Sequence, residues 1–122
     1  MSSIRQNTLK TKSYQFAIAI VNICRILTIE KKEYILSKQL LRSGTSIGAN
    51  IEEANQAESR LDFIHKLSIA NKEAFETHYW IRILRDTDFI DSSTALLFLD
   101  QCEELIKMLT SSINSSKKSL KH

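Results

Sequence analysis

The sequence lacks proline altogether and has only two glycines among its 122 residues. Sandwiches and barrels need turn residues between many short strands, whereas a few long helices need very few, so this composition favours an all-α protein. There are two cysteines, Cys24 and Cys102, and neither belongs to a Cys-x-x-Cys pair or to a spacing typical of zinc sites. We therefore expect two free, buried thiols and no structural metal.

The sequence also lacks a run of about 18 apolar residues and the apolar segment of a signal peptide. These absences predict a cytoplasmic protein without a membrane partner. No phosphate-binding loop, dinucleotide fingerprint, zinc-protease motif or nucleophile elbow occurs, and no Glu-x-x-His pair of a di-iron bundle. Ser43 and Ser46 have no adjacent base of the kind that a serine nucleophile requires. We expect a protein that is not an enzyme and binds neither cofactor nor metal.

The charge balance is mildly basic, with 17 Lys and Arg against 14 Asp and Glu. A net charge of +3 is compatible with nucleic-acid binding but is too small to indicate it without further support. With 43% hydrophobic and 25% charged residues, the composition is that of an ordinary folded domain, and the length suits one domain.

Apolar periodicity predicts four helices in a single domain over residues 13–113. Residues 1–12 are polar and are expected to form a flexible N-terminal arm, and residues 114–122 a flexible tail that contains lysines. The helices are expected to begin at Ser13, near Lys32, at a capping box of Ser59 and Asp62, and at Ser92 or Ser93. Short connections force neighbouring helices to run in opposite directions, which gives an antiparallel up-down-up-down four-helix bundle.

The third predicted helix carries the strongest periodic signal. Its apolar residues recur at steps of four and three and form a heptad seam. The seam consists of Phe63, Leu67, Ala70, Ala74, Thr77, Ile81 and Leu84. Phe75, Tyr79 and Trp80 add aromatic bulk beside it, which is interpreted as core or interface packing. The first and third helices have more apolar surface than a lone bundle can bury, and this indicates contact with another subunit.

The second predicted helix carries an unusual polar line beside its apolar stripe. Arg42, Ser46, Asn50 and Glu53 recur at steps of four, four and three and so share one side of the helix. Two interpretations stay open. The line belongs either to an internal hydrogen-bond network, joined by Glu73 of the third helix, or to a binding site.

Gly44 and Gly48 lie in the same helix, four residues apart, and each costs about 1 kcal/mol relative to alanine there. The bare backbone permits either the close approach of a neighbouring helix or a gap for a ligand or partner subunit. Close packing is the commoner reason for a glycine inside a helix.

These residues resemble a known family. The stretch from Gln39 to Ala54, then Asp62 and Phe63, the stretch from Leu67 to Glu76, and Trp80 are similar to the bacterial four-helix bundle proteins encoded in intervening sequences of 23S rRNA genes. The resemblance runs from about Ser13 to Ile113. Its most specific part is a motif of Arg42, Ser43, Ser46, Ile47, Asn50, Ile51 and Glu53. Many relatives have a proline where this chain has Gly48.

The resemblance implies a protomer that assembles into a homo-oligomeric ring, typically a pentamer. The family also resembles the accessory variability determinant of diversity-generating retroelements, and for that branch the resemblance implies binding to nucleic acid and to a reverse transcriptase.

Two hypotheses about function follow. In the first, the ring presents repeated cations to RNA or DNA. The candidate residues are Arg25, Lys38, Arg42, Lys66, Arg82 and Arg85. In the second, the protein is a structural or protein-interaction scaffold that binds no nucleic acid, and its polar line fixes the register of the helices.

Overall fold

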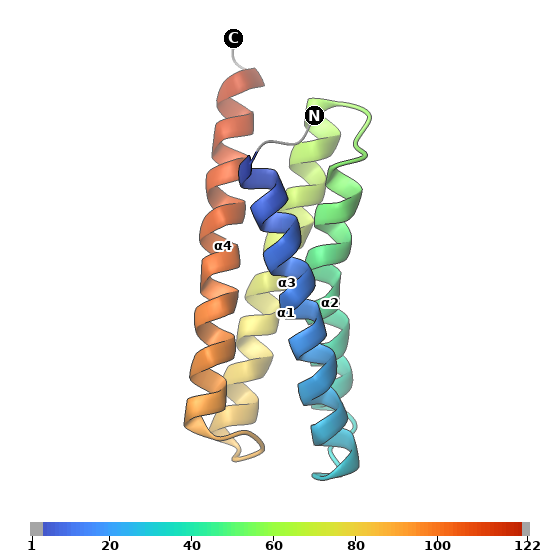
Figure 1. The fold of residues 1–122 in the computed structure, drawn as a ribbon, viewed down its shortest axis with the longest axis vertical. Coiled ribbons are helices and arrows are strands. Elements are labelled where there is room, and N and C mark those ends of the chain that lie inside the picture. Colours follow the sequence, from blue (N-terminus) through green and yellow to red (C-terminus); the bar gives the residue numbers. More distant parts are fainter. Residues whose placement is uncertain (1–3, 121–122) are drawn as a thin grey trace.

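Long apolar stripes fold this chain into a bundle of four α-helices within residues 4–120, the part that the computed structural model describes (Figure 1). The helices are α1 (Ile4–Ile29), α2 (Leu36–Ala54), α3 (Arg60–Asp86) and α4 (Ser92–Leu120). Each runs antiparallel to the one before it, because the turns between them are short. The predicted all-α, up-down-up-down architecture is confirmed, and the described residues include no strand.

The core follows the seam that the sequence predicted on α3. Leu67, Ala70, Ala74, Thr77, Ile81 and Leu84 are all buried, whereas Phe63 is only partly buried and Ile64 takes its place in the core. The alternation of alanine with larger residues lets α2 and α4 approach α3 closely. In the bundle α3 adjoins α2 and α4, and α1 adjoins the same two helices; the diagonal pairs are not neighbours. The side formed by α1 and α2 is therefore opposite the side formed by α3 and α4.

The two glycines of α2 lie against α1. A Cβ atom added at Gly44 would lie 2.8 Å from two side-chain carbons of Ile20, and one added at Gly48 would lie 3.4 Å from the carbonyl oxygen of Ser13. A side chain at Gly44 therefore has no room, while Gly48 has ordinary contact distance. Residues of α1 therefore occupy the space that a side chain at Gly44 would fill, and they lie next to the bare backbone at Gly48.

Two of the four helix starts, those of α1 and α2, differ from the sequence prediction, whereas α3 and α4 begin where it placed them. The capping box of α3 is confirmed, because the Ser59 side chain accepts a hydrogen bond from the Asp62 amide at 3.1 Å. The prediction for Ser13 was wrong, since this residue is buried within α1 and its hydroxyl donates to the carbonyl of Lys10. The prediction that Ser92 or Ser93 caps α4 was also wrong. The carboxylate of Asp91 accepts from the Thr94 amide at 2.7 Å and from the Ser93 hydroxyl at 3.0 Å.

The start of α2 is capped from the preceding turn. One Glu33 oxygen accepts hydrogen bonds from the amides of Ile35 and Leu36, at 3.1 and 3.0 Å, and the other accepts from the amide of Ser37 at 2.7 Å. The helix begins at Leu36, four residues later than the predicted start near Lys32. This carboxylate satisfies amides that the first turn of a helix leaves without intrahelical partners.

The predicted flexible termini are helical wherever the structure describes them, so those two predictions were wrong for residues 4–12 and 114–120. Leu9 is fully buried and continues the α1 stripe one turn before Ser13, and Ser116 is buried near the end of α4. Lys117 and Lys118 lie in the last turn of α4, where cations interact favourably with the helix dipole. Residues 1–3 and 121–122 lie outside the described residues.

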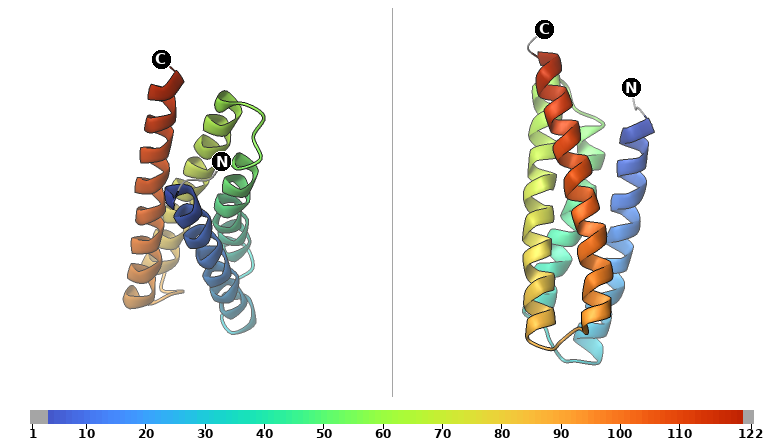
Figure 2. Two further views of the ribbon diagram at one scale, coloured as in Figure 1. Left: turned by 45° about the horizontal axis from the view of Figure 1, so that its top comes forward. Right: turned by 90° about the vertical axis from the view of Figure 1, so that its left-hand side faces the viewer.

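The contact between α1 and α4 closes the bundle. The two helices cross at an angle, as the two views of Figure 2 show. Phe16 and Phe98 meet edge to face with ring centroids 6.1 Å apart, and Lys12 of α1 pairs with Glu104 of α4 at 3.0 Å. These contacts hold α1 between α2 and α4.

Candidate functional site

The predicted polar line lies along the edge where α2 meets α3, at the surface. The Arg42 guanidinium donates to the Glu76 carboxylate at 2.6 Å and lies 3.7 Å from Glu73, both on α3. Glu76 also accepts from the indole nitrogen of Trp80 at 3.3 Å. The Arg42 side chain is 55% exposed, whereas its partners Glu73 and Glu76 are partly buried. The interaction is therefore an ion pair at the surface of the bundle.

The other members of the line do not connect into one network. The Ser46 hydroxyl donates to the carbonyl of Arg42 at 2.6 Å, and the Asn50 amide donates to the carbonyl of Ser46 at 2.8 Å. Glu53 accepts from Lys66 of α3 at 2.9 Å. Each side chain is thus satisfied separately, through the backbone of α2 or through α3. Arg42 and Glu73 come together, while Ser46 and Asn50 bond only within their own helix.

Glu73 is the one carboxylate of this edge whose environment opposes its charge. Burial raises the pKa of Glu73, nearby Glu76 raises it further, and Arg42 lowers it; the net effect is a rise. The Glu73 side chain is only 18% exposed, and its Oε2 accepts no hydrogen bond. Arg42 therefore neutralises a pair of acidic groups on α3, and it is not held free for a ligand.

Most of the candidate cations are similarly engaged. Lys66 pairs with Glu53, and Arg85 pairs with its neighbour Asp86 at 2.7 Å. The Arg82 Nε donates to His78 Nδ1 at 3.0 Å, and its guanidinium lies 5.6 Å from the centre of the Tyr79 ring. Within residues 4–120, only Arg25 and Lys38 of the six candidates have no side-chain partner.

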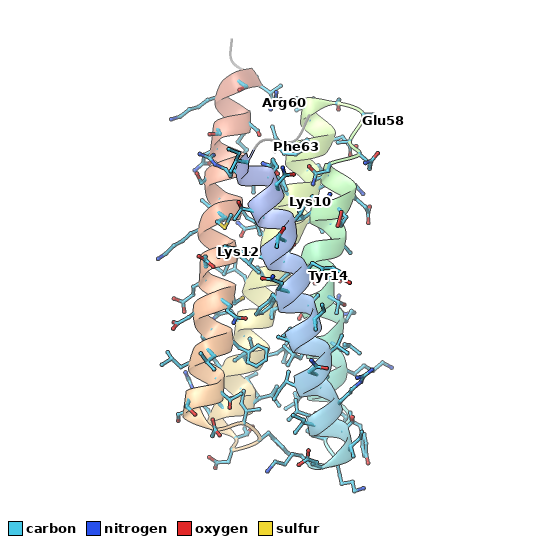
Figure 3. All side chains as sticks on the ribbon, in the orientation of Figure 1. Lys10, Lys12, Tyr14, Glu58, Arg60 and Phe63 are labelled. Atoms are coloured by element: carbon cyan, nitrogen blue, oxygen red, sulfur yellow. The ribbon has the colours of Figure 1, made fainter. Side chains whose placement is uncertain are left out.

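Arg25 and Lys38 lie together, on the rim of a groove between α1 and α2. The groove has a volume of about 310 Å³ and is lined almost entirely by apolar atoms. Its other lining residues are Val21, Cys24, Thr28, Tyr34, Ser37 and Leu41. Tyr14, which is labelled on α1 in Figure 3, is exposed. Ile18 is also exposed, and because both precede Val21 at helical spacing, they extend the apolar surface along α1 away from the groove. We call the surface of Tyr14, Ile18, Val21, Tyr34 and Leu41 the α1/α2 face.

A second exposed apolar surface lies on the opposite side of the bundle. Phe75 and Tyr79 of α3 are 59% and 50% exposed, and Leu96 of α4 is 58% exposed. Phe75 and Ile106 line a shallow pocket with His78, Glu103 and Lys107. Leu96 lies two helical turns before Glu103, which reaches His78 across the α3–α4 junction, so it shares that side of α4. We call the surface of Phe75, Tyr79, Leu96 and Ile106 the α3/α4 face.

A histidine holds α3 and α4 together in this second surface. His78 Nε2 lies 2.9 Å from Glu103 Oε2, while Nδ1 accepts from Arg82. His78 is therefore a structural bridge between the two helices.

The sequence profile of the 23S rRNA-intervening sequence protein family matches residues 5–111. The chain belongs to this family. A crystal structure of a protein of unknown function from the S23 ribosomal protein family of Bacteroides thetaiotaomicron is 50% identical in sequence and superimposes with a TM-score of 0.90. The alignment covers 91% of this chain and 99% of that chain. A search of curated proteins gave no significant match.

The family membership agrees with the resemblance of the α2 and α3 residues and extends it toward the N-terminus. The match begins at residue 5, eight residues before Ser13, which is consistent with the long α1. In this 23S rRNA-intervening sequence protein, the family motif from Arg42 to Glu53 thus lies on the α2–α3 edge, where its polar residues are satisfied within the protomer.

The groups that could carry chemistry in this member of the family are few. The described residues hold no cluster of three or more His, Cys, Asp or Glu side chains that could bind a metal. Burial raises the pKa of Cys24 to about 11 and that of Cys102 to about 12, so both thiols stay protonated and unreactive at neutral pH. Both are free and buried, as expected. No helix within residues 4–120 is long and apolar enough to cross a membrane.

Sequence reasoning missed the polar contact that is buried between α2 and α3. The hydroxyls of Ser43 and Thr77 lie 2.9 Å apart, and both residues are completely buried. Thr77 had been assigned to the heptad seam of its helix, and a small polar residue within that seam was the available signal. Arg25 and Lys38, by contrast, were named as candidates, but the groove between them was not foreseen.

Proposed function

We propose that this protein is a non-enzymatic assembly module whose copies close into a homo-oligomeric ring, with five copies as the size that the family resemblance implies. The observation that carries the proposal is the presence of two apolar faces on opposite sides of one bundle. The α1/α2 face and the α3/α4 face each expose aromatic and aliphatic side chains that the protomer itself does not cover. Contiguous apolar patches of this kind are typical of interaction sites.

Two different faces on opposite sides favour a ring over a two-fold dimer. In a two-fold dimer the same patch of both subunits meets itself, which leaves the other patch uncovered. When one face binds the other face of the next copy, every copy covers both of its patches, and a suitable rotation closes the chain of subunits. The polar α2–α3 edge, which lies between the two faces, then takes no part in the interface between copies.

Between the two earlier hypotheses, the contacts of the cations favour the scaffold. Arg42, Lys66 and Arg85 each pair with a carboxylate, and Arg82 is bound to His78. A cation already paired with a carboxylate must give up that pair before it contacts a phosphate. The side chains of the polar line find their hydrogen-bond and ion-pair partners within the protomer. The line therefore helps to hold α2 against α3 and presents no free group to a ligand.

A second function, nucleic-acid binding, is favoured by one feature, the turn between α1 and α2. Lys31 and Lys32 are exposed there, next to Arg25 and Lys38, and none of the four has an ion pair within the described residues. Glu33 in the same turn is held by the amides of α2. In a ring, this cationic turn is repeated once per copy around one rim, and repetition raises avidity for a polyanion.

Binding of the full-length chain to short RNA and DNA at a series of salt concentrations tests this second function. If the turn binds phosphates, affinity falls steeply as salt rises, and Lys31→Glu with Lys32→Glu reduces both the affinity and the salt dependence. Lys66→Glu, which alters a lysine already paired with Glu53, is the matched control. An affinity at low salt that the Lys31 and Lys32 changes leave intact would contradict binding by this turn. The ring itself is tested by the solution mass of the wild-type chain, which should be that of several 14.0 kDa protomers.

A further inference from the structure

We infer that, in the ring, the groove between α1 and α2 of one copy receives the α3/α4 face of the next copy, and that Arg25 and Lys38 pair with Asp88 and Asp100 of that neighbour. This inference rests on the proposed ring and names its interface. The partner is a second copy of the same chain, and the argument comes from the charges and apolar side chains at one end of the bundle.

The unpaired charges at this end of the bundle are segregated by side, except for the exposed carboxylate of Glu30 beside Lys31. The α1–α2 turn and the α3–α4 turn lie at the same end (Figure 1). Near the first turn are the four unpaired cations Arg25, Lys31, Lys32 and Lys38. Near the second are Asp88 and Asp100, which are exposed and have no side-chain partner within residues 4–120. Head-to-tail contact brings the positive corner of one copy to the negative corner of the next.

The heights of these groups along the bundle are compatible with such contact. At 1.5 Å per residue, Arg25 lies about 6 Å from the end of α1, and Asp100 lies about 12 Å from the start of α4. The difference of about 6 Å is within the length of an arginine side chain. Lys38 is two residues into α2, and Asp88 lies in the turn itself, so these two are also at similar heights.

The apolar residues match in the same way. Val21 lies about 12 Å from the end of α1 and Leu41 about 8 Å from the start of α2, which places the groove on this half of the bundle. On the opposite side, Tyr79 lies about 10 Å from the end of α3 and Leu96 about 6 Å from the start of α4. Tyr79 and Leu96 of the neighbouring copy therefore fill the groove when the ends of the two bundles are level.

The remaining cations of the α3/α4 side do not oppose this arrangement. Arg82 is engaged by His78 and Tyr79. Lys107 lies about 22 Å from the start of α4, and Lys72 about 21 Å from the end of α3, far from the level of Arg25. At the level of the groove the neighbour thus offers aromatic and aliphatic side chains with two free carboxylates, which complements an apolar groove with two free cations.

Charge reversal in the full chain tests the pairing, with the solution mass determined by light scattering and folding by circular dichroism. We expect Arg25→Glu with Lys38→Glu to convert the ring to protomers of 14.0 kDa, and Asp88→Lys with Asp100→Lys to do the same. All four changes in one chain restore the opposite charges across the interface and should restore the ring. Lys31→Glu with Lys32→Glu, which changes the same charge outside the groove, should leave the ring intact.

The outcomes separate this inference from the proposed function. If the wild type is a ring and both charge-reversed variants remain rings of the same mass, the pairing is wrong and the ring proposal stands. If each variant is monomeric and folded but the fourfold variant stays monomeric, the pairing is also wrong, because the partners of Arg25 and Lys38 lie elsewhere. A monomeric wild type overturns the ring, and the pairing with it.

Discussion

Ser43 of α2 and Thr77 of α3 share a hydrogen bond of 2.9 Å between two hydroxyls that are both completely buried. The Thr77 oxygen also lies 2.7 Å from the carbonyl oxygen of Glu73, while Ser43 has only a long contact of 3.4 Å to the carbonyl of Leu40. The Ser43 hydroxyl thus depends on Thr77 for its main partner, whereas Thr77 also reaches a backbone carbonyl of its own helix. In an otherwise apolar seam, this pair fixes the register of α2 against α3.

We expect Thr77→Val to lower the free energy of unfolding by about 1–2 kcal/mol, since it keeps the shape of the side chain and leaves the Ser43 hydroxyl buried without a good partner. Adding Ser43→Ala removes the stranded group, so the double variant should be no less stable than Thr77→Val alone. Urea unfolding at one fixed protein concentration compares the wild type, the single variants Thr77→Val and Ser43→Ala, and the double variant. Losses that simply add in the double variant would mean that the two hydroxyls are not coupled.

The two glycines of α2 should respond oppositely to alanine. At Gly44 a new Cβ meets two carbons of Ile20, a β-branched side chain with little rotamer freedom, and the resulting overpacking costs about 1–3 kcal/mol, more than the helix-propensity gain of about 1 kcal/mol. At Gly48 the nearest atom is at ordinary contact distance, so the propensity gain dominates. Thermal melts should show Gly44→Ala below and Gly48→Ala at or above the wild type. The reverse order would contradict the close approach of α1 at Gly44.

Glu33 should give the protein an acid-sensitive contribution to stability. Burial acts to raise the pKa of Glu33, but the hydrogen bonds from the amides of Leu36, Ser37 and Ile35 outweigh it and lower the pKa below its usual value. A lowered carboxyl pKa in the folded state means that the stabilisation is present above the unfolded pKa of about 4.3 and is lost as the pH falls through the folded value.

Replacing Glu33 by alanine removes the cap and should cost about 1 kcal/mol at pH 7. Glu33→Gln retains hydrogen-bond acceptors but cannot titrate, so the stability difference from wild type should shrink as the pH falls below about 4. Urea unfolding of the three proteins at pH 7 and at acid pH measures both effects. A wild-type advantage over Glu33→Gln that persists unchanged into acid would show that the charge of Glu33 does not act at the cap.

Much of the fold could be predicted from the sequence because its signals are periodic and local. The heptad spacing from Leu67 to Leu84 predicted the buried stripe of α3, and Ser59 with Asp62 predicted the start of that helix. The ends of the bundle were missed because a single apolar residue such as Leu9, in a polar stretch, gives no periodic signal. Its burial depends on the position of the other helices.

The site could be predicted only in part, for a related reason. Charge and spacing identified Arg25 and Lys38 and also Arg42 and Lys66, but they did not distinguish free cations from paired ones. The partner of Arg42 lies on the next helix, 34 residues away along the chain. The spacing within α2 cannot show which residues of α3 face it. The groove between α1 and α2 likewise depends on the packing of two helices and has no counterpart in either sequence segment.

The most direct test of the central claim, that opposite apolar faces assemble the chain into a ring, is the solution mass of the wild type beside two neighbouring substitutions on α4. Leu96 and Leu97 are similarly exposed, at 58% and 64%, but they point about 100° apart around the helix, and only Leu96 belongs to the α3/α4 face. The ring predicts a wild-type mass of several 14.0 kDa protomers, five by the family resemblance, a monomeric Leu96→Glu and an unchanged Leu97→Glu. A wild type that is monomeric at high concentration, or a ring that Leu96→Glu leaves intact, would contradict it.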